Sequence, residues 1–255
     1  MSAGRPLIVG NWKMNGLGAD VAEVRKIAAA LRAEPSRAQA AICAPATLIE
    51  RLARAVKGSD LIIGAEDVDP EAGGPFTGDV SAAMLADAGA RMVIVGHSER
   101  RRGHGETNDM VARKALAAVR SGLQPIICVG ETEAERSRGG ALDVVCRQAA
   151  ESTPAGLAGE AFSLAYEPAW AIGSDQIPEP DEIEEMHAAL REVLVAKLGR
   201  PGGDVQILYG GSVAAANVGG IMNLRHVGGG LVGRASLKAM DFLAILRTID
   251  RATTS

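Results

Sequence analysis

Eight short apolar runs, spread along the whole chain, most constrain the fold. They read PLIVG, AQAAICA, LIIGA, MVIVG, QPIICVG, FSLAY, VQILYGG and GGGLVG, near residues 7, 42, 61, 92, 126, 162, 205 and 231. Each run is continuous rather than alternating in polarity, which is typical of strands buried on both faces. Amphipathic segments separate the runs, so we expect parallel strands joined by helical crossovers.

Two of the separating segments show helical spacing clearly. The first carries apolar side chains at Ile183, Met186, Leu190, Val193 and Leu194 after Pro180, which suits a first helical turn, and the last carries them at Phe242, Ile245, Leu246 and Ile249. No Pro/Ser-rich linker interrupts the eight units. They therefore predict one α/β domain over residues 1–255, a closed (β/α)₈ barrel. The alternative, an open doubly wound sheet, favours a G-x-G-x-x-G turn after its first strand, where this chain has GNWKMNG.

Composition narrows the class of partner and the compartment. The 255 residues are 47% hydrophobic and carry a net charge of −4, with no basic stripe, so we expect no nucleic-acid partner. The three cysteines show neither a disulfide framework nor zinc spacing. No apolar stretch approaches the ~20 residues that span a bilayer, and the first apolar run is too short for a signal peptide. We expect a cytoplasmic protein without membrane association.

Polar residues follow several of the apolar runs directly. Asn11 and Lys13 follow the first run, His97 and Glu99 the fourth, and Glu167 the sixth. Because the chemistry of such barrels lies at the carboxyl ends of the strands, these side chains should gather at one end of the barrel.

Each of these residues also has an ordinary structural interpretation. Lys13 alone is consistent with a solvated lysine, and His97 alone with a histidine satisfied by the backbone. As a set, a carboxylate, an imidazole, an ammonium and an amide suit proton transfer beside a carbonyl, with Glu167 as base. We expect burial to make Glu167 more basic, because desolvation disfavours its charged form.

Other ionisable residues keep structural interpretations. They are His104, His187, His226 and Glu131. Because no two histidines have metal-ligand spacing, we expect no metal. Two glycine-containing turns, YGGSV (209–213) and LVGRASL (231–237), lead into predicted helices. Backbone N–H groups in such turns bind phosphate, and a phosphate site after the seventh and eighth strands is frequent in this barrel.

Five segments in series resemble the triosephosphate isomerase family. They are GNWKMN (10–15), VGHSERR (95–101), YEPAWAIG (166–173), YGGSV and LVGRASL, and FTGDVSAAML (76–85) and GLQPIICVGE (122–131) are similar as well. The resemblance implies an aldose–ketose isomerase of glycolysis and gluconeogenesis, which interconverts dihydroxyacetone phosphate and D-glyceraldehyde 3-phosphate. It also implies a (β/α)₈ barrel that works without a cofactor.

The resemblance assigns roles to particular residues. It makes Glu167 the base, His97 the neutral electrophile held un-ionised by a helix N-terminus, and Lys13 the cation that stabilises the enediolate. Asn11 then contacts the substrate and Glu99 supports Lys13. The phosphate is held by Gly173, Ser212, Gly233 and the amide of Arg234.

The resemblance also implies a lid and a homodimer. Residues 168–175 (PAWAIGSD) would close over the site, with Trp170 as anchor and Ile172 and Leu231 beside the base. Residues 69–79, a glycine-rich loop with Phe76, would insert beside the partner's site.

Four departures from the family pattern affect these expectations. Glu66-Asp67 replaces the usual Gln-Asn, which bears on the subunit contacts, and Ser174-Asp175 alters the end of the lid. Arg234 stands where a second glycine is common. Gly228 replaces an aspartate, so a structural ion pair should be missing.

Three other functions fit the same barrel less well. The altered lid is the one feature that favours a paralogue acting on a four-carbon ketose phosphate. A phosphosugar lyase or aldolase needs a Schiff-base lysine inside a middle strand, and neither PIICV nor FSLAY contains one. A catalytically silent barrel would not need the intact set of Lys13, His97 and Glu167.

Overall fold

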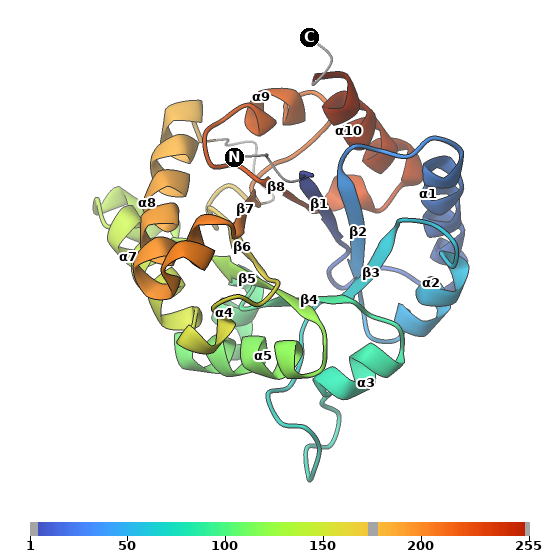
Figure 1. Cartoon of the computed structure of the whole chain (residues 1–255), viewed down its shortest axis with the longest axis horizontal. Coiled ribbons are helices and arrows are strands. Elements are labelled where there is room, and N and C mark those ends of the chain that lie inside the picture. The colour runs from blue at the N-terminus through green and yellow to red at the C-terminus, as the bar shows by residue number, and fades with distance from the viewer. Residues whose placement is uncertain (1–4, 173–177, 253–255) are drawn as a thin grey trace.

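The computed structural model describes residues 5–172 and 178–252, and its strands form one closed parallel barrel (Figure 1). The eight strands are β1 (Leu7–Asn11), β2 (Gln39–Ala44), β3 (Ile62–Ala65), β4 (Met92–Val95), β5 (Gln124–Val129), β6 (Ser163–Tyr166), β7 (Gln206–Tyr209) and β8 (Gly229–Val232). Each strand pairs with the next along the chain, and β8 pairs with β1. The predicted barrel is confirmed, and the open-sheet alternative is wrong.

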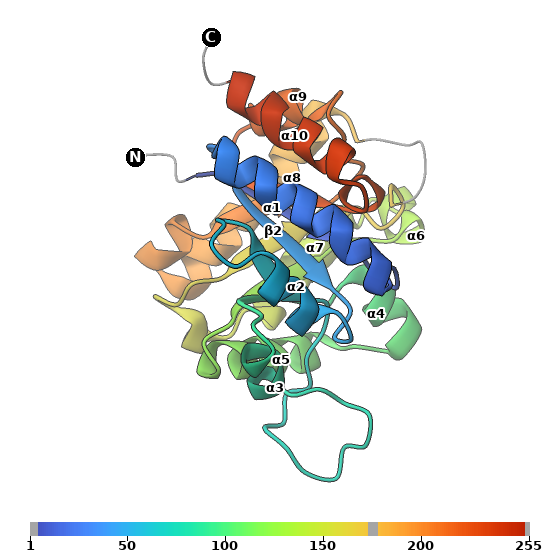
Figure 2. The ribbon, with the colours of Figure 1, turned by 90° about the vertical axis from the view of Figure 1, so that its right-hand side faces the viewer.

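Helices surround this barrel on its outside. They are α1 (Val21–Ala33), α2 (Ile49–Ala55), α3 (Ala82–Asp87), α4 (Ser98–His104), α5 (Asn108–Arg120), α6 (Glu133–Ser137), α7 (Ala141–Ser152), α8 (Pro180–Leu198), α9 (Val218–Met222) and α10 (Ala239–Ala252), with 3₁₀ turns η1 (Gly18–Asp20), η2 (Ala155–Leu157), η3 (Arg200–Gly203) and η4 (Arg234–Ser236). Figure 2 shows α1 and α2 side by side outside β2. No helix in residues 5–172 and 178–252 combines the length and apolar character needed to cross a bilayer.

Local sequence signals set the ends of these helices. Pro180 occupies the first turn of α8, and the N–H of Glu179 donates to Glu182 Oε2 at 2.8 Å. Thr107 caps α5, because its hydroxyl oxygen accepts the N–H of Met110 at 3.2 Å. Both contacts satisfy N–H groups that a helix start leaves without a partner.

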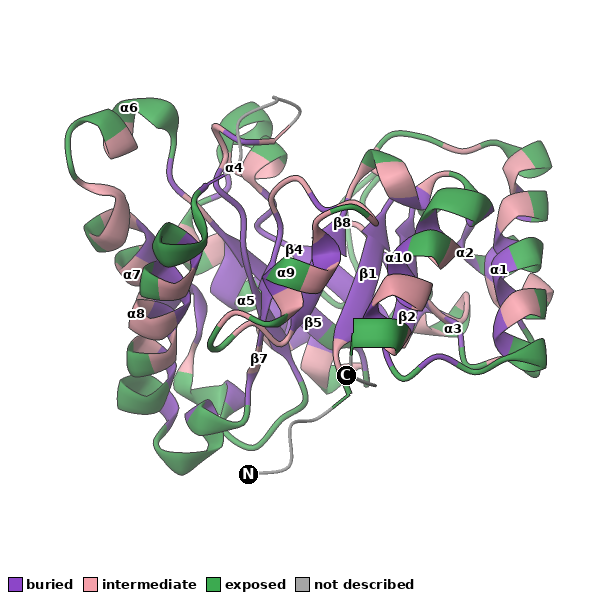
Figure 3. Ribbon diagram, turned by 90° about the horizontal axis from the view of Figure 1, so that it is seen from above, coloured by how far each residue is buried: buried purple, intermediate pink, exposed green. Residues whose placement is uncertain are grey.

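Side chains alternate across each strand between two apolar layers. One layer fills the barrel and includes Leu7, Val9, Cys43, Cys128, Ala165 and Leu231. The other lies between strands and helices and includes Ile8, Ile42, Val93 and Ile127. Figure 3 shows the strands as buried, between helices that carry exposed and intermediate residues as well as buried ones. This double burial explains why the strands read as unbroken apolar runs.

Arg191, on α8, is a partly buried cation. Arg191 forms no ion pair with any described residue. Its guanidinium donates instead to the carbonyl oxygens of Gly202 and Val205, both at 2.6 Å. Backbone acceptors therefore satisfy this cation.

Candidate active site

The predicted acid–base residues follow the carboxyl ends of β1, β4 and β6. We call this end of the barrel the C-terminal rim. Gly96 turns the chain from β4 into α4 with φ +66°, and a Cβ there would lie 2.6 Å from Val111. The turn makes His97 the N-cap of α4, and the imidazole Nδ1 accepts the N–H of Glu99 at 3.1 Å. An Nδ1 that accepts a hydrogen bond carries no proton, so the ring proton lies on Nε2.

His97 and Glu167 form a buried pair. The Nε2 of His97 lies 2.9 Å from Glu167 Oε1, and Glu167 Oε2 accepts the N–H of Ser98 at 3.3 Å. The two side chains are only 5% and 3% exposed. Two residues 70 positions apart in the sequence thus meet, as the strand-end rule predicts.

The pKa of Glu167 lies below its ordinary value. Burial works to raise this pKa, but the charge and hydrogen bond of His97 and the N–H of Ser98 outweigh burial. The expectation that burial makes Glu167 more basic is therefore wrong for this arrangement.

The pKa of His97 is raised above its ordinary value. Burial lowers it, but the Glu167 carboxylate outweighs burial. A raised pKa opposes the prediction of a neutral imidazole while the Glu167 carboxylate contacts Nε2. The hydrogen bond that Nδ1 accepts from the N–H of Glu99, in contrast, favours the neutral form.

Lys13 and Asn11 complete the group at the end of β1. The Nζ of Lys13 lies 2.6 Å from Glu99 Oε1, and the N–H of Lys13 donates to Asn11 Oδ1 at 3.1 Å. Lys13 has a φ of +55°, a backbone strain that concentrates at functional sites. Its positive charge acts on both His97 and Glu167, lowering the pKa of each.

The candidate phosphate residues lie in the turns after β7 and β8. Ser212 is partly buried, and its carbonyl oxygen accepts the side-chain N–H of Asn217 at 2.8 Å. Gly233 precedes η4, which the exposed Arg234 opens. No hydrogen bond or ion pair joins these three residues to the acid–base group within the described chain. Gly173, Ser174 and Asp175 lie outside the described residues. The altered end of the lid, which was the feature favouring a four-carbon substrate, therefore lies outside them too.

Gly210 links the β7 turn to the base. A Cβ on Gly210 would lie 2.7 Å from the Cγ of Glu167. Any side chain at this position would press on the base, so the first glycine of YGGSV leaves the space that Glu167 occupies.

Sequence reasoning missed two contacts of this site. The Cys128 thiol contacts the Glu167 carboxylate, and burial together with that carboxylate raises the pKa of the thiol well above its ordinary value. Glu131 is fully buried, and its Oε1 accepts the indole N–H of Trp170 at 2.7 Å. The position of Cys128 on the fifth run, with its side chain directed into the barrel, could have indicated its contact. For Glu131, the position directly after that run could have done so.

The replaced pair Glu66-Asp67 follows β3. Asp67 forms ion pairs with Arg100 at 2.8 Å and Lys114 at 2.7 Å, so its charge is used within the subunit. Oε1 of Glu66 is buried without a hydrogen-bond partner among the described residues.

Within the described residues, no cluster of histidine, cysteine and carboxylate side chains has the geometry of a metal site. The fold and its ionisable groups define the class of protein: a (β/α)₈-barrel enzyme with acid–base groups at its C-terminal rim. Comparison with known proteins identifies the family. Residues 6–249 match the family model described as triosephosphate isomerase.

Similar proteins cover nearly the whole chain. A triosephosphate isomerase of Caulobacter vibrioides is 54% identical over 245 residues, 96% of this chain and 97% of the relative. One of Hyphomonas neptunium is 50% identical over 95% of this chain and 98% of its own. A crystal structure of triosephosphate isomerase from Bartonella henselae superposes with a TM-score of 0.89 at 42% identity, covering 96% of this chain and 98% of that one. The chain belongs to the triosephosphate isomerase family.

Proposed function

We propose that this protein interconverts dihydroxyacetone phosphate and D-glyceraldehyde 3-phosphate by proton transfer. Family membership over residues 6–249 supports the reaction. The observation that carries the proposal for the mechanism is the buried His97–Glu167 pair, with Nε2 and Oε1 2.9 Å apart. Because the base Glu167 and the proton donor His97 are in contact in the free protein, both can reach adjacent atoms of one small substrate.

Glu167 removes a proton from the carbon beside the carbonyl and returns it to the neighbouring carbon. The Nε2–H of His97 donates to the carbonyl oxygen as negative charge develops there. The ammonium of Lys13 and the amide of Asn11 stabilise that oxygen, and Glu99 holds Lys13 in place. These groups need no metal or cofactor to move the proton.

Substrate must separate Glu167 from His97 before either group can act. Separation removes the imidazole and the N–H of Ser98, which lower the pKa of Glu167 more than the charge of Lys13 does. Burial, the largest influence, then raises that pKa against the smaller effect of the Lys13 charge. The base thus gains strength once the substrate is bound.

The backbone of the turns after β7 and β8 holds the phosphate, through Ser212, Gly233 and the amide of Arg234, with Gly173 from outside the described residues. The segment after Glu167 serves as the lid. Trp170 anchors its start through Glu131, and the guanidinium of Arg136 lies 4.6 Å from the centre of the Trp170 ring. A fixed anchor leaves the following residues to close over the substrate and exclude water.

The test is a coupled assay of the Glu167→Asp variant with glyceraldehyde 3-phosphate. The shorter side chain withdraws the carboxylate by about 1 Å, so we expect kcat to fall about 100-fold. Glu160→Asp, at an exposed position, is the matched control and should keep wild-type turnover. Near-wild-type turnover of Glu167→Asp would eliminate Glu167 as the base. Inhibition of the wild-type enzyme by EDTA, reversed by added metal, would contradict the cofactor-free mechanism.

We also propose that residues 1–255 form one barrel domain that acts as a cytoplasmic homodimer. Residues 69–79, between β3 and α3, project from the barrel (Figures 1 and 2). Apolar side chains stand exposed on this loop and near it in sequence: Phe76 is 41% exposed and Met84 58%. Met14, beside the candidate site, is 98% exposed. A second copy that receives the loop would cover apolar surface that water otherwise solvates.

Sedimentation of a Phe76→Asp variant tests the homodimer. A charge at the loop tip should shift the protein toward monomer at micromolar concentration, whereas Glu160→Asp should sediment like the wild type. A wild-type protein that sediments as a monomer at all concentrations would refute the homodimer.

A further inference from the structure

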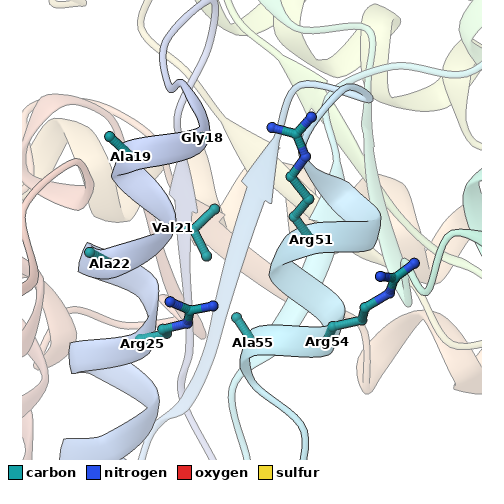
Figure 4. Close-up of a pocket in the computed structure, with 8 residues that line it drawn as sticks. All are labelled: Gly18, Ala19, Val21, Ala22, Arg25, Arg51, Arg54 and Ala55. Atoms are coloured by element: carbon teal, nitrogen blue, oxygen red, sulfur yellow. The ribbon is translucent and has the colours of Figure 1, made fainter.

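A groove between α1 and α2 lies outside the barrel, apart from the candidate active site. Its volume is about 520 Å³. It is lined by Gly18, Ala19, Val21, Ala22, Arg25, Arg51, Arg54 and Ala55 (Figure 4). The first five come from η1 and α1 and the last three from α2. Nothing in the proposed reaction uses these residues.

Small residues keep the groove open. Gly18, Ala19, Ala22 and Ala55 contribute at most a methyl group each. A Cβ on Gly18 would lie 3.1 Å from Arg51 Nη1, so the missing side chain lets this guanidinium lie against the backbone. A small ligand in the groove can therefore approach guanidinium groups and backbone together.

Two arginines face this space from different helices. In Figure 4, Arg25 extends from α1 toward Ala55, and Arg51 rises from α2 to the level of Gly18. Both are exposed, and neither has a hydrogen bond or ion pair with another described residue. Some other arginines of the described chain are bound to carboxylates or carbonyls, as Arg100 and Arg191 are.

Carboxylates on the same helices are already engaged. Glu50 pairs with Arg54, which Figure 4 shows pointing away from α1. Asp20 accepts the N–H of Leu17 at 2.8 Å, and Glu23 binds Lys26 and the N–H of Ala239. The positive charges of Arg25 and Arg51 are thus left without a counter-charge, although the protein as a whole carries a net charge of −4.

We propose that this groove binds a phosphate dianion, either inorganic phosphate or a phosphate monoester. A planar guanidinium donates two parallel N–H groups to phosphate oxygens, and two guanidiniums supply the charge that a dianion requires. The net negative charge of the protein disfavours an extended polyanion such as a nucleic acid, so the ligand is small.

The experiment follows the side-chain Nε–Hε signals of arginine in ¹⁵N-labelled full-length protein by NMR. Inorganic phosphate and glycerol 2-phosphate are titrated separately at constant ionic strength. We expect saturable shifts of the Arg25 and Arg51 signals with a Kd on the order of 1 mM. A stronger response to glycerol 2-phosphate would assign the site to esters, and a stronger response to phosphate to the free ion.

Variants separate this groove from the active site. Arg25→Gln combined with Arg51→Gln should abolish the saturable binding in the groove, while competitive inhibition of the isomerase by phosphate should keep its inhibition constant. Arg120→Gln, an exposed arginine at the end of α5, is the matched control and should leave the Arg25 and Arg51 shifts intact.

Three results would overturn the proposal. One is a linear shift that does not saturate, and another is an equal shift with chloride, since both indicate general screening. The third is a shift that follows protein concentration and ignores phosphate, because it would assign the groove to contact with a second copy.

Discussion

Glu66 gives the sharpest test of the energetics, because a half-buried carboxyl group stands where the family usually has an amide. It follows β3, and its Oε1 is buried without a hydrogen-bond partner among the described residues. Burial raises the pKa of Glu66 to about 8 from an ordinary 4.5, although the N–H of Lys13 works against burial. Replacement by glutamine removes the titrating group and keeps nearly the same shape.

The sign and size of the effect follow from linkage. The folded pKa is raised, so between pH 4.5 and pH 8 the folded state holds a proton that the unfolded state has lost. Stability from this group is full below pH 4.5 and is lost as pH rises through 8. Each pH unit costs about 1.36 kcal/mol, so at pH 7 the loss reaches about 3 kcal/mol. We expect Glu66→Gln to recover most of this loss, which for a chain of this size raises Tm by roughly 5–10 °C.

The assay is thermal and urea unfolding at fixed protein concentration from pH 5 to pH 8.5. The gap between Glu66→Gln and wild type should widen as pH rises and nearly close at pH 5. Glu160→Gln, an exposed carboxylate, should show no such gap. A gap that is absent at pH 8, or constant across the range, would refute the reasoning.

Two further predictions concern Lys13 and His187. Lys13→Ala removes one charge from the developing oxyanion, so kcat should fall by at least about 10²–10³-fold in steady-state assays; a change confined to KM would refute its role in the transition state. Burial lowers the pKa of His187 to about 4 from an ordinary 6.5, so stability from this group is lost as pH falls from 6.5 to 4, by about 3 kcal/mol in all. Urea midpoints of His187→Gln should therefore fall less than those of wild type between pH 7 and pH 5, and parallel curves would contradict this assignment.

The barrel was predictable because its strands are buried on both faces. Continuous runs such as MVIV at β4 carry no alternation, and all eight became strands within a few residues of their predicted places. The hydrogen-bond partners of Arg191, on α8, could not be predicted from the sequence. The guanidinium of Arg191 donates to the carbonyl oxygens of Gly202 and Val205, and these come from η3 and the residues that follow it.

The gathering of the site was predictable from the strand-end rule, whereas its contacts were not. The sequence places Lys13 and Glu99 after different strands, and their ion pair at 2.6 Å follows from neighbouring positions on the rim. The contacts of Cys128 and Glu131 were missed because the sequence alone does not distinguish a buried residue that touches the site from one that only packs in the core. Contact with Glu167 and Trp170 distinguishes them, and such contacts depend on side-chain conformation.

The expectation for Glu167 is wrong because burial is only one of the influences on its pKa. An apolar strand end predicts burial, and burial does raise the pKa of this carboxyl. The donors that reverse the direction come from His97 and Ser98, on an element 70 residues away in sequence, and the sequence alone gives no distance to them. A buried carboxylate with two donors remains ionised in the free protein, which a base must be. The same burial makes Glu167 a stronger base once those donors are withdrawn. Hydrogen bonding to His97 and Ser98 therefore sets its pKa in the free protein, and desolvation raises it when the substrate is bound.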